Sequence, residues 1–299
     1  MGKPNSLPFC LNPWSRIQNA RDLVINIRAF FYVKMLKMID IIKTKRWVDR
    51  LNRDAYLYVA LPRSYHEHPN RRYPVLYAHD GHNLFYPEDS YGGVTWGMQE
   101  TMARDDVPEF IVVALSCAVK GNARLEEYNV FDSHFPSHPT WVARGRGHDY
   151  LSYVLGPLKD EIDGLYRTLP EREHTYMIGS SMGGVISLEA GFLYSSKVGH
   201  IAGLSNAFYA SIHDFSKMIL GASTYPLSMY LDTGDQEEGL EVTSSYVSSN
   251  RMIAQHIHER HLNMRFQYQE IKGGTHHESS WRERLSSVLN FLFLNSPIK

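Results

Sequence analysis

Short apolar runs alternate with segments of helical periodicity along most of this chain, and the alternation limits the folds open to it. The runs at 73–81, 109–117 and 175–178 are largely apolar at consecutive positions, as expected for strands buried on both faces. Helical spacing is clearest from Tyr150 to Tyr166. The pattern predicts an α/β fold, with a mostly parallel central sheet and helices on both faces. Further strands are predicted at 200–208, 226–235 and 264–273, and further helices at 96–104, 182–194, 246–261 and 280–294.

The N-terminal part of the sequence has a different pattern. From Ile39 the chain is strand-rich, and residues 53–62 alternate between the two faces of a strand, which predicts antiparallel strands with one exposed face. A chain of 299 residues is long enough for one sizeable α/β core, so we expect a single catalytic domain over residues 38–299. Residues 1–37 are interpreted as an extension of unknown role. A membrane-surface helix and an over-long gene start are both compatible with it.

Composition excludes several classes of function. The 31 Lys and Arg residues balance the 32 Asp and Glu residues, so no overall field attracts nucleic acid or anionic lipid. The two cysteines, Cys10 and Cys117, lie in unlike surroundings and indicate no disulfide framework. No apolar run approaches the roughly 18 residues needed to span a bilayer, and no secretory signal is visible. We therefore expect a cytoplasmic protein without an integral membrane segment.

A serine lies at the point where a predicted strand becomes a predicted helix. The strand residues 175–178 are followed by Gly179-Ser-Ser181-Met-Gly183, and helical periodicity begins directly afterwards. A turn this sharp needs glycine two positions to either side of its apex, because side chains there would collide. It would hold Ser181 at a helix N-terminus, where backbone N–H groups favour negative charge. This is how a nucleophile for acyl transfer is presented, and a simple tight turn is the alternative interpretation.

An acyl-transfer serine needs a base and a carboxylate that orients the base. Both residue types follow later predicted strands, in the chain order serine, acid, histidine. The histidine candidates are His276 and His277, which come after a Gly-Gly turn. A solvated loop for the acids and a simple helix start for the histidines are the alternative interpretations. The acid candidates are Asp232, Asp235, Glu237 and Glu238.

Stabilisation of an oxyanion requires two converging N–H donors. The first would be the N–H of Met182, which follows the serine. The second is expected from the loop after the strand at 73–81, where Gly81 permits a sharp turn and the N–H of His82 would point at the substrate oxygen. His79 and Asp80 are interpreted as braces of this loop rather than as ligands.

Several segments together resemble the putative-esterase family of α/β-hydrolases, which includes enterochelin esterases, feruloyl esterases and S-formylglutathione hydrolase. The resemblance covers roughly residues 40–294 and implies an α/β-hydrolase fold with Ser181 as nucleophile. Because the family's histidine lies five residues before a tryptophan, it implies His276, with Trp281, and it implies Glu237 as the acid. Asp235 and Glu238 stay open as alternatives. The segments are "YPVLYAHDGHNLF", "RLEEY", "IGSSMGGVISL", "DTGDQEE" and "GGTHHESSW".

A long insert follows the strand at 109–117. It resembles the family's Arg-x-x-Glu-Tyr loop beside the active site, which implies that Arg124, Glu127 and Tyr128 bind substrate. Its aromatic side chains would form a lid or substrate wall, or would simply pin the loop.

No metal or cofactor is expected. Of the histidines in the predicted helix 246–261, only His258 and His261 share a face, and no zinc or nucleotide fingerprint accompanies them. The sequence predicts a cofactor-independent serine carboxylesterase acting on a small acyl or aryl ester. An acyltransferase that passes the acyl group to a sugar or alcohol is one alternative, and a non-catalytic binding protein is another. The sequence predicts no oligomeric state.

Overall fold

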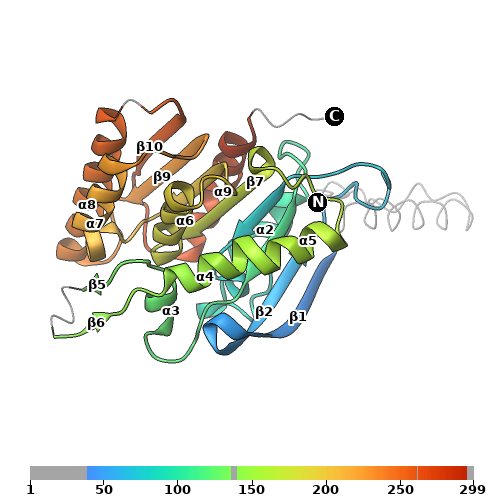
Figure 1. The fold of residues 1–299 in the computed structure, drawn as a ribbon, viewed down its shortest axis with the longest axis horizontal. Coiled ribbons are helices and arrows are strands. Elements are labelled where there is room, and N and C mark those ends of the chain that lie inside the picture. The colour runs from blue at the N-terminus through green and yellow to red at the C-terminus, as the bar shows by residue number, and fades with distance from the viewer. Residues whose placement is uncertain (1–38, 136–139, 261, 295–299) are drawn as a thin grey trace, which may run out of the picture. The chain divides into compact units, whose positions relative to one another are not determined.

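The structure, a computed structural model, describes residues 39–135, 140–260 and 262–294. The predicted extension 1–37 lies outside the described residues. A sheet of eight strands forms the centre of the described part of the chain (Figure 1). Its strands are β1 Ile41–Val48, β2 Arg53–Ala60, β3 Val75–Ala78, β4 Ile111–Leu115, β7 Thr175–Ser180, β8 His200–Leu204, β9 Ser228–Gly234 and β10 Arg265–Ile271.

The sheet is mostly parallel, as predicted. The strand order is β1-β2-β4-β3-β7-β8-β9-β10, and all neighbours from β4 to β10 run parallel. The two N-terminal strands β1 and β2 are antiparallel, and β2 also pairs antiparallel with β4. β3, β4, β7 and β9 are buried along their whole length, whereas most of β1 is exposed or half-buried. The predicted α/β class and its N-terminal antiparallel strands are confirmed.

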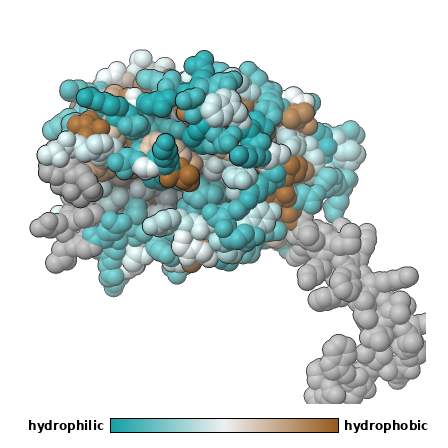
Figure 2. All heavy atoms as spheres, turned by 90° about the horizontal axis from the view of Figure 1, so that it is seen from below, coloured by the Kyte–Doolittle hydropathy of each residue, from teal (hydrophilic) through white to brown (hydrophobic). Residues whose placement is uncertain are grey.

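Alternate side chains of the strands pack into two separate hydrophobic cores, because successive side chains point to opposite faces of a sheet. One core contains Tyr77 and Met177 together with side chains from α4 Gly147–Tyr153, α6 Met182–Leu193, α7 Ile212–Gly221 and α8 Gly239–Glu259. The other contains Leu76 and Ile178 with side chains from α2 Met98–Met102 and α9 Glu278–Phe293. Figure 2 shows that the apolar residues exposed on one face of the molecule lie in small separate patches.

The predicted helix at 150–166 is interrupted. α4 is followed by a π-helical turn over Val154–Leu158 and then by α5 Lys159–Leu165. The break has a physical cause in Pro157, which lacks an N–H for the helical ladder and displaces the preceding turn, so that Gly156 leaves the helical region. The apolar periodicity continues across the turn and therefore does not signal it.

The insert after β4 contains short elements that the sequence analysis did not assign. They are α3 Ala123–Glu127 and a hairpin of β5 Ser133–His134 with β6 Val142–Ala143. α7 was also missed, and α2 is shorter than the predicted helix at 96–104. In the part of the chain that the structure describes, no helix combines the length and the apolar character needed to cross a membrane.

A buried glutamate ties the insert to the helix behind the serine. Glu189 of α6 is fully buried, and both its carboxyl oxygens lie 3.1 Å from the N–H of Val130, which donates to them. Burial raises the pKa of Glu189 well above its usual range, against the weaker opposite effect of this hydrogen bond. The folded protein therefore favours the neutral form of this carboxyl group.

The raised pKa of Glu189 predicts a pH-dependent stability. The unfolded chain releases the Glu189 proton at lower pH than the folded chain does. The contribution of Glu189 to the free energy of unfolding is therefore complete below the ordinary glutamate pKa and is lost as pH rises through the raised pKa of the folded state. Glu189→Gln keeps an acceptor for Val130 and cannot ionise. Relative to the wild type, it should gain unfolding free energy between pH 5 and pH 8, because the wild type loses the contribution of neutral Glu189 over this range. Urea unfolding at both pH values measures this gain. The exposed Glu283→Gln serves as control, and a pH-independent effect of Glu189→Gln would contradict the interpretation.

Candidate active site

The backbone at Ser181 is strained in the way that the sequence pattern predicts. Ser181 joins β7 to α6 with φ 57° and ψ −123°, a region that side-chain-bearing residues rarely adopt. A Cβ on Gly179 would lie 2.4 Å from the carbonyl carbon of Gly183, so any larger residue there would force the turn open. The N–H of Ser181 donates to the carbonyl of Leu204 at 2.9 Å. The turn therefore holds the serine hydroxyl at the carboxyl end of the sheet.

His276 and Glu237 meet at the same edge of the sheet, because both follow neighbouring parallel strands, β10 and β9. Nδ1 of His276 lies 2.8 Å from Oε2 of Glu237, and the backbone N–H of His276 donates to the carbonyl of Glu237 at 3.2 Å. The other carboxyl oxygen accepts from the N–H of Gly234 and, at 3.3 Å, from the hydroxyl of Thr233. Burial alone would raise the pKa of Glu237, but His276 and the hydrogen bond from the N–H of Gly234 act in the opposite direction, and the pKa is lowered. The carboxylate is thus kept charged beside the imidazole.

The other predicted acids have different contacts. Asp232 is buried against Arg284, with N–O distances of 2.7 and 3.0 Å, and Asp235 accepts from the N–H of Gly273 at 2.6 Å. Glu238 lines the cavity of Ser181 and is exposed. His277 is the N-cap of α9, and its side chain accepts from the N–H of Ser279 at 3.2 Å. Among the acids that the sequence left open, Glu237 is the one whose carboxylate contacts His276.

Tyr246 of α8 lies between the serine and the histidine, and the sequence analysis missed it. Its hydroxyl is 3.5 Å from Nε2 of His276, and the two rings are 4.9 Å apart between centroids. Burial raises the pKa of Tyr246 well above its usual range, while a hydrogen bond with the Ser181 hydroxyl acts in the opposite direction. The phenol is therefore neutral and contacts both groups. Only its place on the buried face of a helix was visible in the sequence, and that place is typical of any core residue.

The loop after β3 is held against the sheet below the serine. Asp80 has φ 51°, and a Cβ on Gly81 would lie 2.8 Å from the carbonyl carbon of Ala114 in β4. His82 follows in a short 3-10 helix and lines the same cavity as Ser181. Met182 is the first residue of α6, so its N–H has no acceptor one turn earlier in the helix. Both predicted oxyanion donors therefore come from segments that border the serine.

An ion pair fixes this loop. Arg124 contacts both carboxyl oxygens of Asp80 at 2.7 and 2.8 Å. Burial alone would raise the pKa of Asp80, but Arg124 lowers it to about 2. His79, the neighbouring residue, is buried, and its Nδ1 lies 2.7 Å from the hydroxyl of Tyr150. These contacts match the predicted bracing role of His79 and Asp80.

The three residues predicted to bind substrate occupy different environments. Arg124 lines the Ser181 cavity. Glu127 is buried and pairs with Arg53 at 2.7 Å through both of its oxygens. Tyr128 is fully buried, and its hydroxyl accepts from the N–H of Asp80 at 3.1 Å. Of the three, Arg124 lines the Ser181 cavity, Glu127 lines a neighbouring cavity, and Tyr128 supports the loop after β3.

The Ser181 cavity has a volume of about 580 Å³. Its walls come from the loop after β3, the insert after β4, the serine turn and the loop before α9, and include Tyr91, Leu125 and Trp281. Asp80, His82 and Cys117 place possible metal-ligand atoms within 4.8 Å of one another. Arg124 occupies both oxygens of Asp80, and its positive charge opposes a bound cation. This cluster is therefore better described as an ion-paired support.

The sheet order, the turn at Ser181 and the acid and histidine after β9 and β10 define an α/β-hydrolase. The sequence model of the family described as "Putative esterase" matches residues 49–292. The chain belongs to this esterase family and is a carboxylic ester hydrolase, which confirms the resemblance. The uncharacterized protein YbbA of Bacillus subtilis (strain 168) is 23% identical over 248 residues, which are 81% of this chain and 93% of that protein.

Solved structures share the fold. An IroE-like serine hydrolase from Shewanella oneidensis matches with a TM-score of 0.66 and 17% identity, over 85% of this chain and 80% of that one. A ferulic acid esterase matches with a TM-score of 0.61 and 18% identity, over 85% and 98%. The enterobactin esterase FES from Shigella flexneri matches with a TM-score of 0.64 and 16% identity, over 86% and 60%. At these identities the likeness concerns the fold.

Removal of the Arg124 guanidinium should destabilise the loop after β3 and lower the free energy of unfolding. Arg124→Met leaves the Asp80 carboxylate buried without its counter-charge, and we expect a loss of about 2 kcal/mol of unfolding free energy, at the low end for such pairs because Arg124 is partly exposed. Asp80→Asn combined with Arg124→Met should lose less than Arg124→Met alone, because no charge is then stranded. Chemical denaturation of the wild type and the variants measures both differences. Equal losses in the single and double variants would contradict a stabilising ion pair.

Proposed function

We propose that the chain hydrolyses a small-molecule carboxylic ester through an acyl-enzyme on Ser181, with His276 as the general base and Glu237 as the carboxylate that orients it. One observation carries the proposal. A buried glutamate holds Nδ1 of His276 at 2.8 Å, and this histidine lines one cavity with a serine at the apex of a strained strand-to-helix turn. Membership of the esterase family supports the reaction class.

The contact with Glu237 selects the tautomer of the base. With the carboxylate charged, Nδ1 carries the proton and donates it to Oε2, so Nε2 is the free acceptor. In the resting arrangement Nε2 has the Tyr246 hydroxyl as its neighbour. For reaction, the Ser181 hydroxyl turns from Tyr246 to Nε2 and gives up its proton as its oxygen attacks the ester carbonyl.

Charge on the attacked carbonyl oxygen is stabilised by backbone donors. The N–H of Met182 opens α6, a helix of 12 residues, where the helix dipole favours an anion. The N–H of His82 supplies the second donor from the braced loop after β3. Each donor of this kind contributes about 10²–10³ in rate. His276 then returns its proton to the leaving alcohol, and water activated by the same imidazole releases the acid from Ser181.

Loss of the nucleophile should abolish turnover without unfolding the protein. Ser181→Ala removes the attacking oxygen, so we expect the rate of p-nitrophenyl acetate hydrolysis to fall by about 10³ or more. Circular dichroism should stay unchanged, because alanine also lacks bulk at this turn. A variant that is folded and retains the wild-type rate would refute the acyl-enzyme mechanism.

Two neighbouring acids of the loop after β9 offer a matched comparison. Glu237→Gln removes the charge that orients His276, and we expect kcat for p-nitrophenyl acetate to fall by about 10²–10⁴. Asp235→Asn changes the same charge at a position whose side chain accepts from Gly273 and lies outside the Ser181 cavity, and kcat should stay within about threefold. A larger loss in Asp235→Asn than in Glu237→Gln would assign the acid elsewhere.

A further inference from the structure

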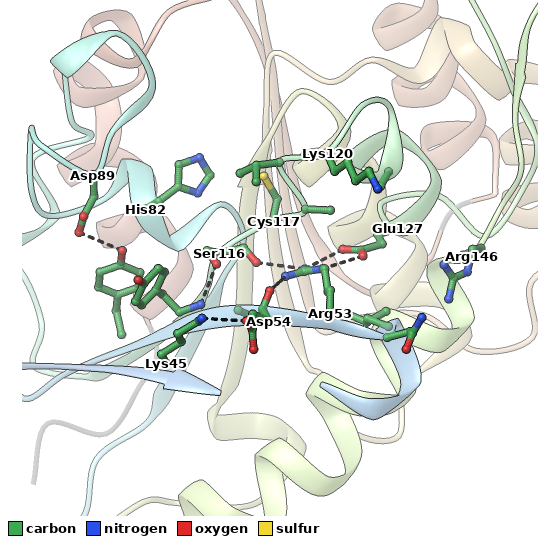
Figure 3. A pocket seen from close by; sticks show the side chains of 18 of the residues that line it. Lys45, Arg53, Asp54, His82, Asp89, Ser116, Cys117, Lys120, Glu127 and Arg146 are labelled. Atoms are coloured by element: carbon green, nitrogen blue, oxygen red, sulfur yellow. Dashed lines mark hydrogen bonds and ion pairs between the residues drawn. The ribbon is translucent and has the colours of Figure 1, made fainter. Parts of the chain in front are cut away.

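A second cavity adjoins the Ser181 cavity and takes no part in the mechanism described so far. It has a volume of about 660 Å³ and lies between β2, the loop after β3 and the insert after β4 (Figure 3). The two cavities have four lining residues in common and therefore adjoin each other. We take a molecule bound at Ser181 to extend from one cavity into the other. The shared residues are His82, Cys117, Ala118 and Val119.

The floor of the second cavity is rigid. Arg53 of β2 forms two contacts of 2.7 Å with the carboxylate of Glu127 in α3, and it also donates to the carbonyl of Ser116 at 3.1 Å. The N–H of Tyr56 donates to the hydroxyl of Ser116 at 2.9 Å. Figure 3 shows this network crossing the base of the cavity from β2 to the insert. These contacts join the cavity walls, so the space is formed before any ligand binds.

The cavity carries no net charge to attract an ion. Its lining has four basic residues, Lys45, Arg53, Lys120 and Arg146, and four acidic ones, Asp54, Glu88, Asp89 and Glu127. Several of them pair with one another or with neighbouring residues, as Lys45 does with Asp54 at 2.8 Å.

Most of the remaining lining residues are aromatic or aliphatic, and Asn52, His82 and Ser116 are polar. The aromatic and aliphatic residues include Tyr56, Tyr58, Leu51, Ala55, Ala118 and Val119. Since the charges balance and the hydroxyl of Tyr58 is already bound to Asp89 at 2.9 Å, the surface suits an uncharged, largely apolar group.

The position of the second cavity relative to His276 determines which part of an ester can enter that cavity. The leaving oxygen must lie within hydrogen-bond reach of Nε2 of His276, because it receives the proton from there. His276, Glu278 and Trp281 line only the Ser181 cavity, whereas the second cavity lies beyond the loop of His82. A substituent that extends from the carbonyl carbon into the second cavity therefore points away from the leaving oxygen. In an ester, this substituent is the acyl chain.

We propose that the second cavity, here named the acyl cavity, binds a bulky uncharged acyl group, so that the natural ester carries an acyl part much larger than acetyl. This inference rests on the proposed function, since it takes Ser181 as the attacked position and His276 as the proton donor. The alcohol part occupies the Ser181 cavity near Leu125 and Trp281.

Two ester series test the proposal. The first keeps p-nitrophenol as the leaving group and varies the acyl group from acetyl through butanoyl to octanoyl. The second keeps the acetyl group and varies the alcohol from methyl to benzyl and naphthyl. For the wild type we expect kcat/KM to rise by about tenfold or more from acetate to octanoate. A flat or falling acyl series would overturn the proposal.

A bulky side chain that fills the acyl cavity should remove the rise in kcat/KM from acetate to octanoate. Ala123 lines the acyl cavity but not the Ser181 cavity. Ala123→Phe should therefore lower kcat/KM for octanoate by about tenfold while leaving p-nitrophenyl acetate and the alcohol series within about twofold. Leu125→Phe on the same helix is the matched control, because Leu125 lines only the Ser181 cavity. It should change acetate and octanoate by the same factor.

The outcomes separate the two proposals. The acyl-cavity proposal would be overturned if Ala123→Phe left octanoate hydrolysis unchanged or lowered kcat/KM only for esters of large alcohols. Acetate hydrolysis that depends on Ser181 would still support the proposed function in that case. Acetate hydrolysis that survives Ser181→Ala would instead overturn the function. Tyr56→Ala, at a half-exposed wall position, is a second variant in case Ala123→Phe does not fold, and it should also lower the octanoate-to-acetate ratio.

Discussion

The close approach of Gly179 to Gly183 is the constraint on which the rest of the site depends. It permits the backbone of Ser181 to take φ 57° and ψ −123°, which ends β7 and starts α6 within one residue. The hydroxyl is thereby held at the carboxyl end of the sheet, next to the first N–H of a helix. The loops after β3, β9 and β10 end at the same edge because these strands are parallel, and so their side chains can meet the serine.

Buried polar contacts keep those loops in place. Arg124 secures Asp80 and with it the position of His82, while Glu237 secures His276. Arg53 and Glu127 tie β2 to the insert after β4 and form the floor of the acyl cavity. Each pair links segments far apart in the sequence, so the two adjoining cavities share walls of fixed shape. We infer that the protein positions its substrate with preformed surfaces, the arrangement that favours electrostatic stabilisation of a transition state.

Much of the fold could be predicted from the sequence, because continuous apolar runs and helical periodicity are local signals. The strands of the parallel sheet and the helix after Ser181 correspond to elements in the structure. His276 and Glu237, which the resemblance implies, contact each other there, and their catalytic roles stay predictions. The π-helical turn at Pro157 could not be predicted, since the apolar period continues through it. Tyr246 and the acyl cavity depend on contacts between distant segments, and no local pattern marks such contacts. The predicted cytoplasmic location and the role of residues 1–37 stay predictions.

The central claim is that Ser181 is a nucleophile activated by His276, and covalent labelling with a fluorophosphonate tests it most directly. The probe should form one adduct, which peptide mass spectrometry places on Ser181. Labelling should slow by at least about 100-fold in His276→Ala, because the serine then lacks its base. An adduct on another residue, or equal labelling rates in the wild type and His276→Ala, would contradict the account.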